Sequence, residues 1–160
     1  MKKTMFSIAA AILLSAQAWA GDYVNDGKKF SVTLPECWHL TDELPMEVFF
    51  SCTGNEDLGA AVEIIKDAKL GDKRVIDRID LTNRAVTLDR HTASHKMPAR
   101  RIDGNAFSEG DKLTFYSISI DPGSGQPILQ LSIWGPPESM KNRNFRKNLE
   151  RMLASFTPTK

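Results

Sequence analysis

Cys37 and His39 stand on either side of a single tryptophan, and a thiol beside an imidazole can act as a nucleophile with its general base. A second cysteine, Cys52, would close a loop of about 15 residues with the first, and such a disulfide stabilises a fold by about 3 kcal/mol. A nucleophile requires a reduced thiol, whereas a disulfide requires an oxidising compartment. The cellular compartment in which the protein resides therefore decides whether Cys37 is a catalytic nucleophile or part of a structural disulfide.

The N-terminus has the three parts of a secretory signal peptide. Two lysines come first, an apolar run follows, and the small residues Ala18 and Ala20 precede a cleavage site. The apolar run is shorter than the roughly 20 residues that a membrane-spanning helix needs. No cysteine follows the cleavage site to carry a lipid anchor. We expect residues 1–20 to be removed and residues 21–160 to form one domain, with neither a membrane span nor a lipid anchor.

A short signal that begins with lysines is typical of bacteria, so the sequence predicts a periplasmic protein of a Gram-negative bacterium. The periplasm oxidises thiols and preserves disulfides. This location favours a disulfide between Cys37 and Cys52 over a nucleophile formed by Cys37 and His39.

The charge balance argues against a dedicated nucleic-acid binder. Removing residues 1–20 removes two lysines and no acidic residue, which leaves 19 basic and 20 acidic residues. A nucleic-acid-binding domain normally carries a strong basic excess. We therefore expect no nucleic-acid partner.

The remaining residues that are capable of chemistry lack the surroundings that it needs. His91 and His95 would share one face of a helix, as a zinc site requires. Their segment favours a strand, however, on which the two rings would be about 13 Å apart. We expect two solvent-facing histidines and no cofactor, with a metal site as the minor alternative. Ser124 lies between two glycines rather than in the strand–turn–helix setting of a nucleophilic serine, and we expect no enzymatic activity.

Alternating apolar residues predict strands along most of the chain. The segment at 121–127 holds two glycines and two prolines, which predicts a turn between two paired strands. The predicted strands cover residues 28–34, 46–52, 60–67, 89–95, 99–108, 112–120 and 128–134.

Two helices are predicted. Asp72 can cap a helix over residues 73–85, and Ser139 can cap a C-terminal helix. The C-terminal helix carries an apolar stripe at helical spacing, made of Phe145, Leu149, Met152, Leu153 and Phe156. The stripe could lie on a membrane, but packing on a sheet explains it more simply. The sequence therefore predicts an α+β fold: an antiparallel β-sheet with flanking helices and a C-terminal amphipathic helix packed on the sheet.

Three segments resemble the PsbP/DcrB-like fold family. Residues 30–38, FSVTLPECW, are similar to its entry strand and the corner that follows. Residues 96–104, KMPARRIDG, resemble its mid-chain strand entry, and residues 145–156 resemble its closing helix. The resemblance implies a binding fold rather than an enzyme scaffold, because its relatives include photosystem subunits, a Ran-binding transport factor, envelope lipoproteins and chaperones of type VI secretion effectors.

The chain departs from the family pattern at two places where the family has glycine. Cys37 occupies the first and Lys96 the second. A positive φ at the first place would strain Cys37, because only glycine adopts that conformation freely. The disulfide could compensate for this strain.

Three segments are candidates for binding a partner: 41–45, 53–59 and 121–127. We expect the first two to be loops at opposite ends of one strand, both constrained by the disulfide and both acidic, which would suit a basic partner surface. Trp134 could be an exposed anchor of the kind that interfaces favour, although its residue type favours burial in the core. The candidate partner-binding residues are Asp42, Glu43, Glu56, Asp57, Asp121, Ser124 and Trp134.

The sequence therefore predicts a non-catalytic periplasmic protein-binding module. Its most concrete form is an immunity protein that inhibits a secreted, type VI-like toxin or another enzyme acting on the envelope. The alternative is an envelope accessory protein that binds a small ligand, a metal or an outer-membrane component. Nothing in the sequence fixes the oligomeric state.

Overall fold

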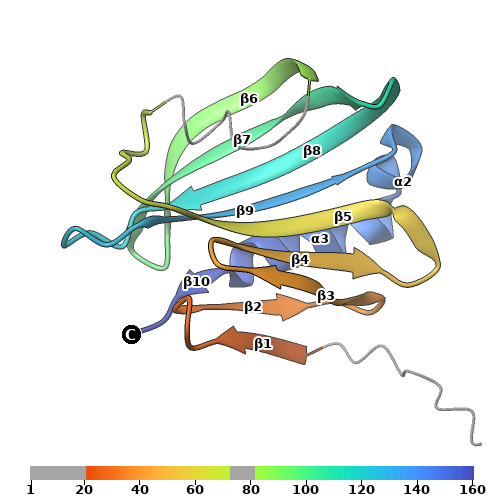
Figure 1. Ribbon diagram of the computed structural model, residues 1–160. Helices are drawn as coiled ribbons and strands as arrows, with labels where there is room; N and C mark the ends of the chain where they lie inside the picture. Colours follow the sequence, from red (N-terminus) through yellow and green to blue (C-terminus); the bar gives the residue numbers. More distant parts are fainter. Residues whose placement is uncertain (1–20, 73–81) are drawn as a thin grey trace, which may run out of the picture.

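The computed structural model describes residues 21–72 and 82–160. Ten strands and two helices form these parts of the chain (Figure 1). The elements are β1 (Gly21–Asn25), β2 (Phe30–Leu34), β3 (Trp38–Leu44), β4 (Glu47–Cys52), β5 (Asn55–Ile65), β6 (Thr82–Ser94), β7 (Met97–Ser108), β8 (Asp111–Ile120), β9 (Ile128–Gly135), α2 (Pro137–Lys141), α3 (Arg143–Ser155) and β10 (Thr157–Pro158).

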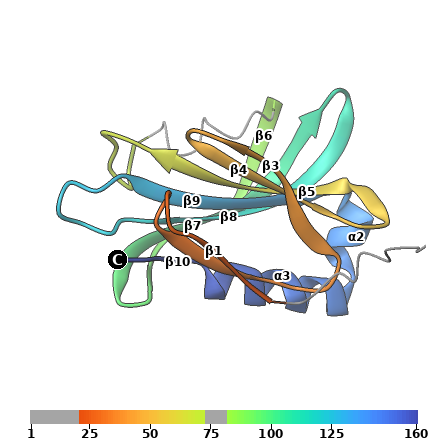
Figure 2. The ribbon, with the colours of Figure 1, turned by 60° about the horizontal axis from the view of Figure 1, so that its bottom comes forward.

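The strands form two antiparallel sheets. The larger sheet has seven strands in the order β3-β4-β5-β9-β8-β7-β6, and the smaller has three in the order β1-β2-β10. Helix α3 lies along one face of the larger sheet, beside the smaller sheet (Figure 2). The predicted α+β class is confirmed, and so is the packing of the C-terminal helix on the sheet.

The main core lies between the larger sheet and α3. A row of paired residues crosses this face, with Val48 opposite Val62, Val62 opposite Leu131, and Leu131 opposite Ile118. All four are buried. The helix stripe meets them, since Leu149, Met152, Leu153 and Phe156 are at most 1% exposed. Full burial of each such side chain contributes about 2 kcal/mol before the cost of ordering it.

The start of the C-terminal helix differs from the prediction. Ser139 lies inside the short helix α2, and Asn142 caps α3 by accepting hydrogen bonds from the backbone N–H groups of Asn144 and Phe145, both at 3.1 Å. An asparagine oxygen satisfies these otherwise unpaired donors as well as a serine does. The predicted apolar stripe is confirmed. The predicted single C-terminal helix is instead two helices, α2 and α3, separated at Asn142.

Part of the predicted helix at 73–85 is also wrong. Residues 73–81 lie outside the described residues, but 82–85 begin the long strand β6, which pairs with β7 from Thr82 onward. The pairing with β7 overrides the weak helical pattern of this segment. Strands β1 and β3 and the two-residue strand β10 were not predicted, and β5 begins five residues earlier than expected, at Asn55.

Both residues that replace the family's glycines adopt a left-handed backbone. The φ angle is 78° at Cys37 and 65° at Lys96. The strain anticipated at Cys37 is therefore present, because a side chain at positive φ is disfavoured. Cys37 is bonded to Cys52, so the disulfide holds the turn in which the strained residue lies.

Candidate functional site

The Cys37–His39 pair is not a nucleophile with its base. Cys37 and Cys52 form a disulfide that joins the turn before β3 to the end of β4. The Nδ1 atom of His39 instead lies 3.2 Å from the hydroxyl of Thr53. The predicted structural disulfide is confirmed, and it is typical of proteins that reside outside the reducing cytoplasm.

The two other histidines occupy different elements. His91 is exposed in the edge strand β6, whereas His95 is in the turn between β6 and β7. The Nε2 atom of His95 lies 2.9 Å from the carbonyl oxygen of Ala154 in α3. Within residues 21–72 and 82–160, no group of three potential metal ligands comes together.

An acidic groove lies at the end of the larger sheet where β5 begins and β9 ends. Its carboxylates are Asp57 in β5, Glu109 in the β7–β8 turn and Asp111 in β8, and Lys112 provides a single ammonium group. The half-buried indole of Trp134 lines the groove, whose volume is about 490 Å³. We call this site the acidic groove.

Local packing fixes the position of Trp134. The residue pairs with Gly59 on β5 and with Phe115 on β8. A Cβ atom at Gly59 would lie 2.6 Å from the indole ring, so only glycine leaves room for it. The indole packs against the buried cluster of Ile102, Ala106 and Phe115. These contacts hold an aromatic side chain in place beside the carboxylates.

The acidic groove contains two of the predicted partner-binding residues, Asp57 and Trp134. Glu56 is exposed next to it but does not line it. Sequence reasoning missed Glu109 and Asp111. The sequence does contain a signal for them: the segment Ser-Glu-Gly-Asp at 108–111 is typical of a turn, and it places these two acidic residues between two predicted strands.

Asp42 and Glu43 do not lie in a loop as predicted. Both are exposed residues of β3, the edge strand of the larger sheet. A hydrogen bond from Lys28, supported by one from Asn25, lowers the pKa of Glu43 below its ordinary value. Charged residues on an edge strand oppose pairing with another chain, which accounts for these acids without a ligand.

Asp121 and Ser124 lie far from the acidic groove, in the β8–β9 loop at the other end of the sheet. A carboxylate oxygen of Asp121 accepts a hydrogen bond from the backbone N–H of Gly123 at 2.8 Å. Ser124 is exposed at positive φ within the same loop. The structure gives Asp121 a role in shaping the turn.

Two buried arginines hold the β6–β7 side of the molecule together. Arg101 binds Asp103 and also Glu150 of α3, whose Oε1 is 3.0 Å from Nη2. Burial alone would lower the pKa of Arg101, but hydrogen bonds to these two carboxylates outweigh it and raise the pKa. Arg100 forms a bidentate pair with Asp89, and this hydrogen bonding lowers the pKa of Asp89. All of these partners are internal, so both arginines are structural.

No helix among residues 21–72 and 82–160 has the length and apolar character needed to cross a membrane. No protein-family model matches the chain, and no curated protein matches it either.

Solved structures with a similar backbone do exist. The cyanobacterial PsbP (CyanoP) of Synechocystis sp. PCC 6803 matches with a TM-score of 0.66 and 11% identity, over 96% of this chain and 98% of its own. The Ran-binding protein Mog1p of Saccharomyces cerevisiae matches with a TM-score of 0.61 and 9% identity, over 86% and 94%. LpqN of Mycobacterium tuberculosis, involved in cell envelope biogenesis, matches with a TM-score of 0.57 and 12% identity, over 82% and 83%.

Two of these proteins have different roles on a similar backbone, Ran binding for Mog1p and cell envelope biogenesis for LpqN, so the similarity identifies architecture and not activity. They confirm, at the level of fold, the resemblance carried by the entry strand and the closing helix. The chain has the α+β fold shared by PsbP and Mog1.

Proposed function

We propose that this protein is a non-catalytic module of the bacterial periplasm that binds a partner protein through the acidic groove. One observation carries the proposal: Trp134 is held by Gly59 and the Phe115 cluster yet still lines a groove that holds three carboxylates. A rigidly held tryptophan that remains partly exposed is typical of an interface anchor.

The chemistry of the groove favours a basic partner. An arginine or lysine side chain placed over an indole gains about 0.5–2 kcal/mol from the ring quadrupole. Asp57, Glu109 and Asp111 would attract the same cation, and carboxylates that face a guanidinium form strong, charge-assisted hydrogen bonds. Long-range attraction between opposite charges also speeds association.

The most specific form of the proposal is an immunity protein that inhibits a secreted, type VI-like toxin acting on the envelope. A small domain held by a disulfide suits the oxidising periplasm in which such a toxin would act. The Mog1 structure is that of a Ran-binding protein, so this backbone can present a protein-binding surface. In this form, the acidic groove would receive a basic side chain of the toxin and block its active site.

Capture of the partner by matched variants tests the proposal. The purified protein is immobilised and exposed to periplasmic and secreted fractions of its source, and the retained proteins are identified by mass spectrometry. Asp57→Asn combined with Asp111→Asn should reduce retention of the partner at least tenfold, because it removes two of the three groove carboxylates. Asp42→Asn combined with Glu56→Gln is the control, since both residues are exposed outside the groove.

A partner retained equally by both double variants would contradict binding through the acidic groove. The immunity form has its own test: cells producing the captured partner in their periplasm should survive with the wild-type protein. They should lose viability with the Asp57→Asn/Asp111→Asn variant. If the captured partner is not toxic, the proposal of a protein-binding module stands, but the immunity role is excluded.

A further inference from the structure

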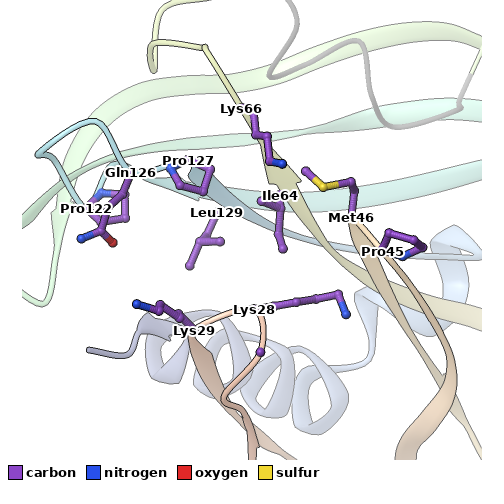
Figure 3. A pocket seen from close by; sticks show the side chains of 11 residues that line it. Lys28, Lys29, Pro45, Met46, Ile64, Lys66, Pro122, Gln126, Pro127 and Leu129 are labelled. Carbon is purple, nitrogen blue, oxygen red and sulfur yellow. The ribbon is translucent and has the colours of Figure 1, made fainter.

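A second site lies at the opposite end of the larger sheet. The strands β5 and β9 run from the acidic groove to a pocket of about 260 Å³, where β5 ends and β9 begins. Ile64 and Leu129 belong to this pocket (Figure 3). Because side chains alternate along a strand, Leu129 and Trp134 lie on opposite faces of β9. We call this site the lysine pocket.

The floor of the lysine pocket is aliphatic. Ile64 and Leu129 project into it from the sheet, and Met46 and Pro127 flank them from neighbouring turns (Figure 3). No aromatic residue lines it among the described part of the chain. This floor suits a flexible hydrocarbon segment better than a ring, and methionine adapts readily to such a segment.

Three lysines from two segments surround this floor. Lys28 and Lys29 come from the β1–β2 turn, and Lys66 follows β5 (Figure 3). Lys28 is paired with Glu43, and only 12% of its side chain is exposed. Lys29 and Lys66 are exposed and form no ion pair with any described residue. Two ammonium groups are therefore available to an anion above an apolar floor.

We infer that the lysine pocket binds a single-chain anionic amphiphile, with its carboxylate or phosphate headgroup at Lys29 and Lys66 and the start of its hydrocarbon chain on Ile64 and Leu129. Charge complementarity selects the anion and the aliphatic floor selects the chain. Neither feature alone points to this ligand, but the two occur together in one pocket. The site is independent of the acidic groove and of the proposed protein partner.

Titration of the purified protein with octanoate and octyl phosphate tests the inference and separates the two headgroups. Calorimetry measures affinity, and NMR follows the methyl groups of Met46, Ile64 and Leu129. We expect binding of at least one anionic probe with shifts in these methyl groups. Octyltrimethylammonium has the same tail with the opposite charge and should bind at least tenfold more weakly. Inorganic phosphate lacks the tail and should not shift the methyl groups.

Paired lysine variants provide the control. Lys29→Ala combined with Lys66→Ala should weaken binding of the preferred probe about tenfold, since two favourable charge contacts are lost. Lys141→Ala combined with Lys147→Ala removes the same charge from the exposed side of the helices and should leave affinity unchanged. All four substitutions retain a Cβ atom, and thermal unfolding verifies that each variant folds.

Three results would overturn the inference: equal binding of the cationic and anionic probes, equal loss of affinity in the two double variants, or no binding of either anionic probe. Capture of a basic partner at the acidic groove would not depend on any of these results.

Discussion

The two ends of β5 and β9 present opposite chemistry on one scaffold. At one end, three carboxylates and Lys112 surround an indole, and at the other, three lysines surround aliphatic side chains. Both strands are buried between these ends, and the charged residues that line the two sites lie at the strand ends and in the adjoining turns. The sheet therefore fixes the separation of two sites whose chemistry is set by turns, which tolerate substitution better than the core does.

The two ends are also held in different ways. A disulfide between Cys37 and Cys52 lies next to the β4–β5 turn, where the backbone N–H of Thr53 donates to the carbonyl of Cys37 at 2.8 Å. At the lysine pocket, the corresponding hydrogen bond runs from the N–H of Ile64 to the carbonyl of Met46 at 2.9 Å, and no disulfide supports it. A covalent bond therefore constrains the acidic end more directly.

Removal of the disulfide should have the largest effect. The substitutions Cys37→Ala and Cys52→Ala together should lower the free energy of unfolding by about 3 kcal/mol, because the bond closes a loop of about 15 residues. Urea unfolding measures this change. Amide hydrogen exchange should rise at the β4–β5 turn much more than around Leu129. Equal increases in amide hydrogen exchange at both ends would contradict the conclusion that the disulfide constrains the acidic end more than the lysine end.

Replacing Cys37 with glycine in the same background isolates the backbone strain. Cys37→Gly with Cys52→Ala should be more stable than the double alanine variant by about 1 kcal/mol, because glycine adopts a φ of 78° without a steric cost. If the two variants unfold at the same urea concentration, the strain assigned to Cys37 is absent.

Enlarging Gly59 should disturb only the acidic end. Gly59→Ala places a Cβ atom 2.6 Å from the indole of Trp134, which must shift, at a cost of about 1–3 kcal/mol. Binding of the basic partner should weaken while octyl phosphate binds as before. The neighbouring substitution Ala61→Gly on the same face is a control for changes in β5 alone. An unchanged partner affinity would show that the indole position does not matter for binding.

The smallest effect concerns pH at the lysine end. Hydrogen bonds from Lys28 and Asn25 lower the pKa of Glu43 below its ordinary value. A depressed carboxyl pKa gives a stabilising contribution that is present above the ordinary pKa of a glutamate and is lost as the pH falls through the lower folded-state value. NMR titration of the Glu43 carboxyl carbon should show this low pKa, and Lys28→Ala should raise it. A pKa unaffected by Lys28→Ala would contradict the pairing.

The sequence predicted the parts of the fold that have regular apolar patterns. The stripe of α3 was correct because its buried residues recur at helical spacing. The β8–β9 hairpin was correct because two apolar runs flank a segment of glycines and prolines. Strand β3 was missed because it is an edge strand: after Trp38, all of its residues are exposed, and no alternation remains to be recognised. The segment that begins β6 was taken for a helix because its pairing partner lies more than ten residues away.

The sites were harder to predict than the fold. The acidity of the residues around Asp57 was visible, but Glu109 and Asp111 join them only because the β7–β8 turn lies beside β9 and β5. The lysine pocket was missed entirely, since Lys28, Lys29 and Lys66 are ordinary surface lysines in sequence. The residues of a site formed by several turns come together only through the order of strands in the sheet. Local sequence patterns do not reveal this order.

The separation of the two sites can be measured directly with two small probes. The purified protein is titrated with acetyl-arginine-amide and, separately, with octyl phosphate, while NMR records the indole N–H of Trp134 and the methyl groups of Ile64 and Leu129. We predict that the arginine probe shifts the indole signal alone and that octyl phosphate shifts the methyl signals alone. Shifts of the same residues by both probes, or an indole signal that does not respond to the cation, would contradict the account.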